Sequence, residues 1–226
     1  MRVCLVTDNS LNTLWQDGLS QLEEQNLVVF GFNGMGLVSY KKELIGQTEY
    51  FQDLAKLSKQ LNTTIICGTD TDTYGVFRHS AVVADRGRIL GVSDSVHTID
   101  ESEFVSGGNY SVYQTSAGKI GVIVAEDIFF AESSKHLSMC GADFIVCIIK
   151  KLENFMPITL IKANSFMNGV ATALVAQEYA SVANSQGKII SAAKSDLLKV
   201  KVNIDKEYHI ISSRRRGISV EKTSPY

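Results

Sequence analysis

Residues 118–132, which read GKIGVIVAEDIFFAE, constrain the fold of this chain more than any other stretch. Residues 120–124 form a short, nearly pure apolar run, which is typical of a strand buried on both faces. Acidic and aromatic residues follow directly, and a helix is predicted over residues 130–140. Side chains at such a junction emerge at the carboxyl end of a sheet, beside free helix N–H groups. We therefore expect the functional chemistry to lie here.

Apolar strands alternate with helix-period segments along the whole chain, which predicts an α/β fold. Strands are predicted over residues 2–7, 27–30, 63–68, 79–85, 88–92, 110–115, 119–124, 143–149, 171–177, 179–183, 188–192 and 197–204, the last in the sheet of its predecessors or at its edge. Helices are predicted over residues 11–24, 48–61 and 130–140. Another helix is predicted to begin at Pro157, with Leu160, Ile161 and Met167 on one face. Residues 33–46 are predicted to be a loop.

Composition places few restrictions on function beyond excluding some partners. The 226 residues are expected to form one domain over residues 1–226, and 45% hydrophobic with 20% charged residues is ordinary for a globular protein. A formal net charge of −2 gives no sign of nucleic-acid binding. No segment approaches the ~20 apolar residues of a membrane span. We predict a cytoplasmic protein with neither a nucleic-acid nor a membrane partner.

The four cysteines do not suggest a cofactor. Cys4, Cys67 and Cys147 lie in apolar runs, where a cysteine usually serves as a small buried hydrophobe. Cys140 falls in the helix beyond the junction, and we expect it to pack rather than react. No Cys or His spacing is typical of a metal site, so neither a metal nor another cofactor is predicted.

The stretch at residues 118–132 resembles the nitrilase (carbon–nitrogen hydrolase) superfamily. The chain matches the family pattern at Gly118, Lys119, Ile120, Gly121, Asp127, Phe130 and Glu132. Ala125 stands where the family has its nucleophilic cysteine, and Ala131 where it has a proline. The resemblance extends from about residue 27 to residue 215. It implies a four-layer αββα sandwich, which periodicity alone does not give.

Two further positions differ from the family's catalytic residues. After the strand at residues 27–30, Phe32 stands where the family has its general-base glutamate. Ser95 stands where the family has the lysine that stabilises the oxyanion, although His97 two residues later matches. The family often has another acid nearby, and Asp100, Glu101 and Glu103 are the candidates here.

These three replacements predict a pseudoenzyme. Splitting an amide or nitrile needs a nucleophile, a base that activates it, and stabilisation of the developing negative charge. Phe32, Ser95 and Ala125 supply none of these in the family's manner. We therefore predict a non-catalytic binding or regulatory protein. The replacements should also make the old pocket more apolar, so that it is closed or binds an uncharged small molecule.

The alternative is a hydrolase that acts on non-peptide C–N bonds with altered catalytic residues. It would use Glu126, Asp127, Ser95 and His97, which must then converge on one open cavity. Ser95 and His97 would share a face if they lay on a strand. The plainer interpretation of Asp127 is a carboxylate that accepts N–H bonds at the helix start. The remaining histidines, His79 among them, are isolated in the sequence, so surface or core roles are expected.

The candidate pocket residues are therefore His97, Glu101, Glu103, Glu126, Asp127 and Glu132, of which Glu132 is expected to order the junction. The resemblance also implies self-association, because family members form dimers that join two sandwiches. We expect a homodimer or a higher oligomer built on the helix at residues 130–140 and the C-terminal segment.

Overall fold

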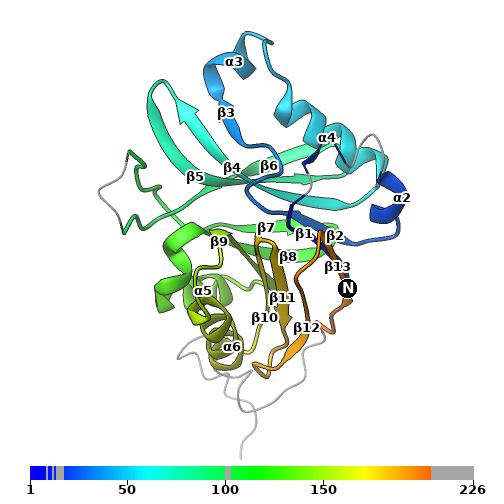
Figure 1. Ribbon diagram of the computed structural model, residues 1–226, viewed down its shortest axis with the longest axis vertical. Helices are drawn as coiled ribbons and strands as arrows, with labels where there is room; N and C mark the ends of the chain where they lie inside the picture. The colour runs from blue at the N-terminus through cyan, green and yellow to red at the C-terminus, as the bar shows by residue number, and fades with distance from the viewer. Residues whose placement is uncertain (9, 12, 14–17, 100–102, 205–226) are drawn as a thin grey trace, which may run out of the picture.

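The computed structural model describes residues 1–226 with the exception of residues 9, 12, 14–17, 100–102 and 205–226. Two β-sheets pack face to face, and helices cover the outer face of each (Figure 1). The predicted four-layer αββα sandwich is confirmed.

The first sheet is built around three parallel strands. Its order is β13 (Leu197–Lys201), β1 (Arg2–Val6), β2 (Leu27–Phe30), β4 (Thr64–Thr73), β5 (Val76–Asp85) and β6 (Arg88–Asp94), with the short β3 (Leu37–Ser39) paired to β4. Strands β1, β2 and β4 are parallel to one another, whereas β13, β5 and β6 join antiparallel to their neighbours. Its helices are α2 (Leu19–Leu22), α3 (Tyr40–Leu44) and α4 (Tyr50–Gln60).

The second sheet repeats this plan with a parallel centre. Its order is β12 (Ile189–Ala193), β11 (Tyr179–Ala183), β10 (Ala171–Gln177), β9 (Phe144–Lys151), β8 (Gly118–Val124) and β7 (Val112–Thr115). Strands β8, β9 and β10 are parallel, and the other pairs are antiparallel. A 3₁₀ helix, η1 (Ala125–Phe129), follows β8, and the helices α5 (Ala131–Met139) and α6 (Met156–Asn168) form the outer layer.

Three hydrophobic clusters hold the four layers together. One lies between the sheets and includes Leu5, Val29 and Ile66 from the first and Val122 and Ile148 from the second. A second lies between the first sheet and its helices, and a third lies between the second sheet and α5 and α6. Alternate side chains of each central strand therefore point into two different clusters, which is why these strands are apolar throughout.

Most of the predicted elements are confirmed. Both hairpins form, with Asp85 paired to Arg88 and Thr115 paired to Gly118. Pro157 lies in the first turn of α6, where its missing N–H costs nothing. The helix predicted over residues 11–24 is seen at Leu19–Leu22, and residues 12 and 14–17 lie outside the described part.

Four predictions about elements and packing are wrong. The predicted loop at residues 33–46 contains β3 and α3, which are too short to show a periodic pattern. Strand β13 pairs with β1 in the first sheet, not with the strands before it. Met167 is 62% exposed, because the buried face of α6 is completed by the small polar residues Asn164, Ser165 and Asn168. Cys140 is exposed at the end of α5 rather than packed.

Candidate functional site

Ala125 forms the junction between β8 and η1. Its φ is 51°, in the left-handed region that side-chain-bearing residues rarely adopt, and it is only 5% exposed. Its methyl group belongs to the cluster between the sheets. The backbone therefore makes a sharp, strained elbow at the position where the sequence resemblance expects the nucleophile.

Phe32 lies just beyond β2, at the carboxyl end of the first sheet. The two sheets come so close here that a Cβ on Gly68 would lie only 2.8 Å from Cγ2 of Ile148 and 3.1 Å from the Phe32 nitrogen. The Phe32 ring packs edge-on to His79, with 5.8 Å between ring centroids. It is 9% exposed and belongs to the same inter-sheet cluster as Ala125.

Ser95 follows β6 and is tied into the main chain. Its N–H donates to the His79 carbonyl at 2.8 Å, and its hydroxyl donates to the His97 carbonyl at 2.8 Å. Gly107 N–H donates to the Ser95 carbonyl. Ser95 and His97 therefore lie in a turn beyond the strand, and the Ser95 hydroxyl bonds to the His97 main chain, not to its ring.

Asp127 anchors this turn to η1. Its carboxylate accepts the N–H groups of Val96 and His97 at 2.9 and 2.8 Å, and its Oδ1 lies 3.0 Å from His97 Nδ1. The sequence predicted that Asp127 accepts backbone N–H groups at the helix start. It does accept backbone N–H groups, but these belong to the turn after β6. Burial raises the pKa of Asp127, although the hydrogen bonds from Val96 and His97 oppose that shift.

A tyrosine and a serine complete the network around His97. The Tyr110 hydroxyl lies 3.0 Å from His97 Nδ1 and 2.7 Å from Ser133 Oγ, which itself donates to the Asp127 carbonyl. The His97 ring also stacks on Phe130, with centroids 3.7 Å apart. Burial raises the pKa of Tyr110 to about 12, so its hydroxyl stays protonated. Asp127, Tyr110, Ser133 and His97 Nδ1 are thus joined by hydrogen bonds, which is the arrangement of a structural brace.

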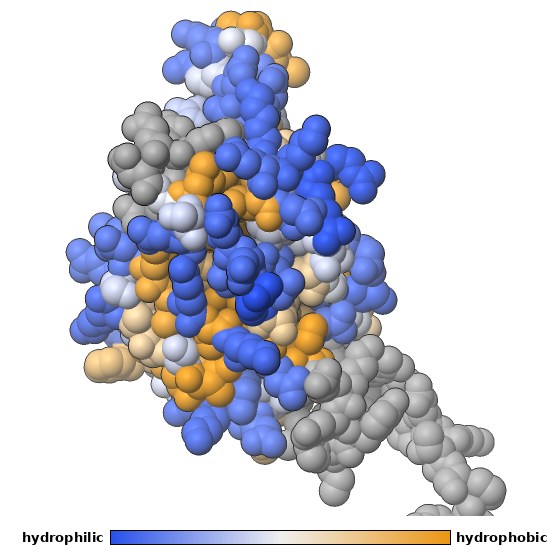
Figure 2. Space-filling model, turned by 90° about the vertical axis from the view of Figure 1, so that its right-hand side faces the viewer, coloured by the Kyte–Doolittle hydropathy of each residue, from blue (hydrophilic) through white to orange (hydrophobic). Residues whose placement is uncertain are grey.

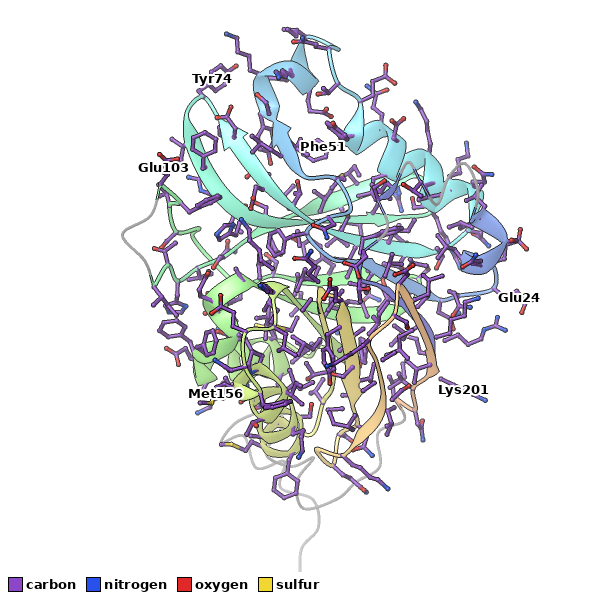
Figure 3. The ribbon with its side chains drawn as sticks, in the orientation of Figure 1. Glu24, Phe51, Tyr74, Glu103, Met156 and Lys201 are labelled. Atoms are coloured by element: carbon purple, nitrogen blue, oxygen red, sulfur yellow. The ribbon has the colours of Figure 1, made fainter. Side chains whose placement is uncertain are left out.

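The described acidic candidates other than Asp127 are not hydrogen-bonding partners in this network, although the charge of Glu132 acts on Tyr110 and helps to raise its pKa. Glu126 is partly buried, and its Oε2 has no hydrogen-bond partner among the described residues. Glu103 and Glu132 are exposed, and Glu103 lies at the outer edge of the molecule in Figure 3. Glu101 and Asp100 lie outside the described residues. The structure therefore brings Ser95, His97 and Asp127 together.

Sequence reasoning missed a second polar cluster at the same end of the sandwich. His79 Nδ1 lies 2.7 Å from Asp70 Oδ1, and Lys150 Nζ lies 2.9 Å from Asp70 Oδ2. The His79 ring stacks on Phe104 at 3.8 Å. Asp70 lies in the second half of β4, whose sequence TDTDT has the polarity of a loop, so no pattern indicated it. Lys150 is the first polar residue after the buried run of β9, and this position was the one feature of the sequence that could have indicated the cluster.

The four layers and the elbow after β8 define a protein of the nitrilase fold. Residues 21–206 match the model of the family described as carbon-nitrogen hydrolase, so this chain belongs to that family. Its sequence is 23% identical over 159 residues to a probable nitrilase of Schizosaccharomyces pombe, in a match that covers 64% of this chain and 58% of that protein. The chain thus spans less than two thirds of the length of that relative.

Solved structures agree on the fold. An amidase mutant from Nesterenkonia, with acrylamide added at its active-site cysteine, has a TM-score of 0.77 at 18% identity over 96% of both chains. A carbon-nitrogen hydrolase from Helicobacter pylori has a TM-score of 0.74 at 18% identity, covering 90% of this chain and 89% of that one. None of the helices in the described part of the chain is long and apolar enough to cross a bilayer.

Proposed function

We propose that this chain is a carbon-nitrogen hydrolase relative that binds a ligand or partner without cleaving it. The observation that carries the proposal is Ala125, a methyl group at the elbow after β8. In a well-studied hydrolase, loss of the nucleophile alone lowers turnover by about 10⁶. Phe32 cannot accept a proton, and Ser95 has no charge to place on an oxyanion. Loss of an oxyanion donor costs about 10²–10³.

The cysteines of the chain offer no substitute nucleophile for Ala125. Cys4 and Cys67 point into the cluster under the helices of the first sheet, and Cys147 points into the cluster under α5 and α6. Ala125 and Phe32 belong to the cluster between the sheets. Burial raises the pKa of all three buried thiols, which keeps them protonated. Cys140 follows the end of α5 that is remote from η1, and the nine residues of this helix extend about 13 Å, so its thiol is far from the elbow.

An alanine at this position is compatible with ligand binding in a relative. A cysteine-to-alanine mutant of the Nesterenkonia amidase, with a TM-score of 0.74 to this chain, was solved in complex with butyramide. That complex supports a binding role for the elbow end of the present chain.

The test is an assay for ammonia release from short amides, nitriles and ureido compounds. We expect no turnover above background, while a cysteine-containing amidase measured in parallel is active. Turnover that stays with the protein through successive purification steps, and falls in a His97→Ala or Glu126→Gln variant, would overturn the proposal. That result would favour the altered hydrolase instead. The hydrogen bonds around Ser95 weigh against it, because its hydroxyl is not bonded to the His97 ring.

We also propose that the partner includes a second copy of this chain. The outer surface of α5 and α6 carries several exposed apolar side chains, namely Met139, Phe155, Met156, Phe166 and Met167. Phe155 is 80% exposed and Phe166 50%. Exposed apolar side chains at both ends of α6 and at the end of α5 are groups that an interface would remove from water. The C-terminal segment that was expected to share this interface lies outside the described residues.

A further inference from the structure

Lys150 is enclosed by groups that suit a cation. Its Nζ lies 2.9 Å from Asp70 Oδ2, 4.8 Å from the centroid of the Phe104 ring and 5.7 Å from that of Phe32. Cation–π attraction operates within about 6 Å of a ring centroid. One carboxylate and two aromatic faces therefore surround one ammonium group.

The walls of this enclosure are held in place without the help of Lys150. Asp70 lies in β4, and its other oxygen is fixed by His79 at 2.7 Å. The rings of Phe32 and Phe104 both contact His79, which is buried between them. Burial raises the pKa of Asp70, but the hydrogen bonds from His79 and Lys150 more than offset it, so the pKa lies below its usual value. With Lys150 in place, Asp70 is thus ionised at neutral pH, and the contact with His79, which does not involve Lys150, helps to position its carboxylate.

The occupant is held less firmly than the walls. The side chain of Lys150 is 46% exposed, against 23% for Asp70 and 9% for His79. An exposed lysine contributes little through its ion pair, because water and salt screen the charge and the long side chain loses entropy. Lys150 also lies near the end of β9, beyond the buried part of the strand. It can therefore leave the enclosure while Asp70, His79 and the two rings stay.

We propose that Asp70, Phe32 and Phe104 form a binding box for primary alkylammonium ions, and that Lys150 is its resident occupant. A ligand amine would take the place of the Lys150 ammonium and its carbon chain that of the lysine stem. The proposal revises the expectation of an uncharged ligand, because the carboxylate of Asp70 was not foreseen there. It rests on the proposed function only in treating this end of the sandwich as a binding site.

The test removes the occupant and supplies it again from solution. In a Lys150→Ala variant, ethylammonium, propylammonium and butylammonium should raise the Tm by about 2 °C or more near saturation, since a ligand that binds only the folded state stabilises it. The alcohols of equal length should not, because they lack the charge. Lys150→Met fills the same space without a charge and should show no amine-specific response.

Two further variants make the result decisive. Lys151→Ala removes an equal charge from the neighbouring residue of β9, whose side chain points to the other face of the sheet, and should respond no more than the parent protein. Adding Asp70→Asn to Lys150→Ala should abolish the response to amines. The proposal is overturned if Lys150→Ala responds no more than Lys150→Met, or if the double variant keeps the response. Neither outcome depends on the ammonia-release assay, so failure of the two proposals can be told apart.

Discussion

At the scale of single residues, the backbone at Ala125 keeps a conformation that its side chain does not favour. A non-glycine residue in the left-handed region costs about 1–2 kcal/mol. Enzymes keep such strain where it positions a reacting group. Here the strained elbow carries only a methyl group.

Ala125→Gly tests whether this strain is present. Glycine would relieve the left-handed conformation, and this gain opposes the loss of a buried methyl group and the greater freedom of the unfolded chain. We expect a free energy of unfolding within about 1 kcal/mol of the parent. Ala173→Gly, in the buried centre of β10, loses a methyl group without any relief and should cost about 1–2 kcal/mol more. Equal losses in urea unfolding would show that the elbow is not strained.

Asp127 is the residue on which the turn after β6 depends. Asp127→Ala would leave the N–H groups of Val96 and His97 without their acceptor in a buried setting. We expect a loss of about 2–4 kcal/mol in the free energy of unfolding, measured by chemical denaturation. Asp127→Asn keeps one acceptor oxygen and should lose less.

Glu132→Ala is the matched control for Asp127, because Glu132 is an exposed acid on the neighbouring helix. Its effect should stay within about 0.5 kcal/mol. A comparable loss in both variants would contradict the role assigned to the Asp127 carboxylate.

At the scale of elements, α3 serves as the N-terminal cap of α4. The first residue before α4, Glu49, makes no side-chain cap bond. Instead, the Glu43 carboxylate in α3 accepts the N–H groups of Tyr50 and Phe51 at 3.1 and 3.2 Å. A negative charge at this end also suits the helix dipole.

Glu43→Ala should therefore destabilise the protein by about 1 kcal/mol, which corresponds to a fall in Tm of about 2–4 °C for a chain of this size. Lys42→Ala, an exposed neighbour in the same helix, should leave the Tm unchanged. If both variants lower the Tm alike, the effect belongs to α3 as a whole and not to the cap.

The elements also show what could be predicted from the sequence. Buried strands such as β2, β8 and β9 were recognisable because apolar runs between turns have few other interpretations. The second half of β4 was missed, because its alternating Thr and Asp residues lack apolar character, yet it pairs fully with β5. The assignment of Phe32, Ser95 and Ala125 to the family's catalytic positions stays a prediction of the resemblance. Asp70, His79 and Lys150 come together only through strand pairing and sheet packing, which no local pattern encodes.

At the scale of the whole molecule, the surface is not uniform. Hydrophilic residues cover most of the upper half of the face shown in Figure 2, whereas apolar residues are more widespread in its lower half and at its apex. The apex is formed where α3 ends, and the exposed apolar residues there are Leu44 and Ile45. The end of α3 and the outer surface of α5 and α6 are two of the exposed apolar regions in the described part of the chain.

The proposed self-association distinguishes these two regions. We expect the protein to elute with the mass of a dimer or larger assembly in size-exclusion chromatography with light scattering. Phe166→Asp combined with Met167→Asp places two charges on the outer surface of α6, and a charge buried without a partner opposes association. The assembly should therefore dissociate.

Leu44→Asp combined with Ile45→Asp makes the same chemical change at the end of α3 and should leave the mass unaltered. A monomeric parent protein, or dissociation caused only by the α3 variant, would contradict an interface on α5 and α6. Phe166 and Met167 are exposed in the monomer, so their substitution should act on assembly while the monomer keeps its circular dichroism spectrum.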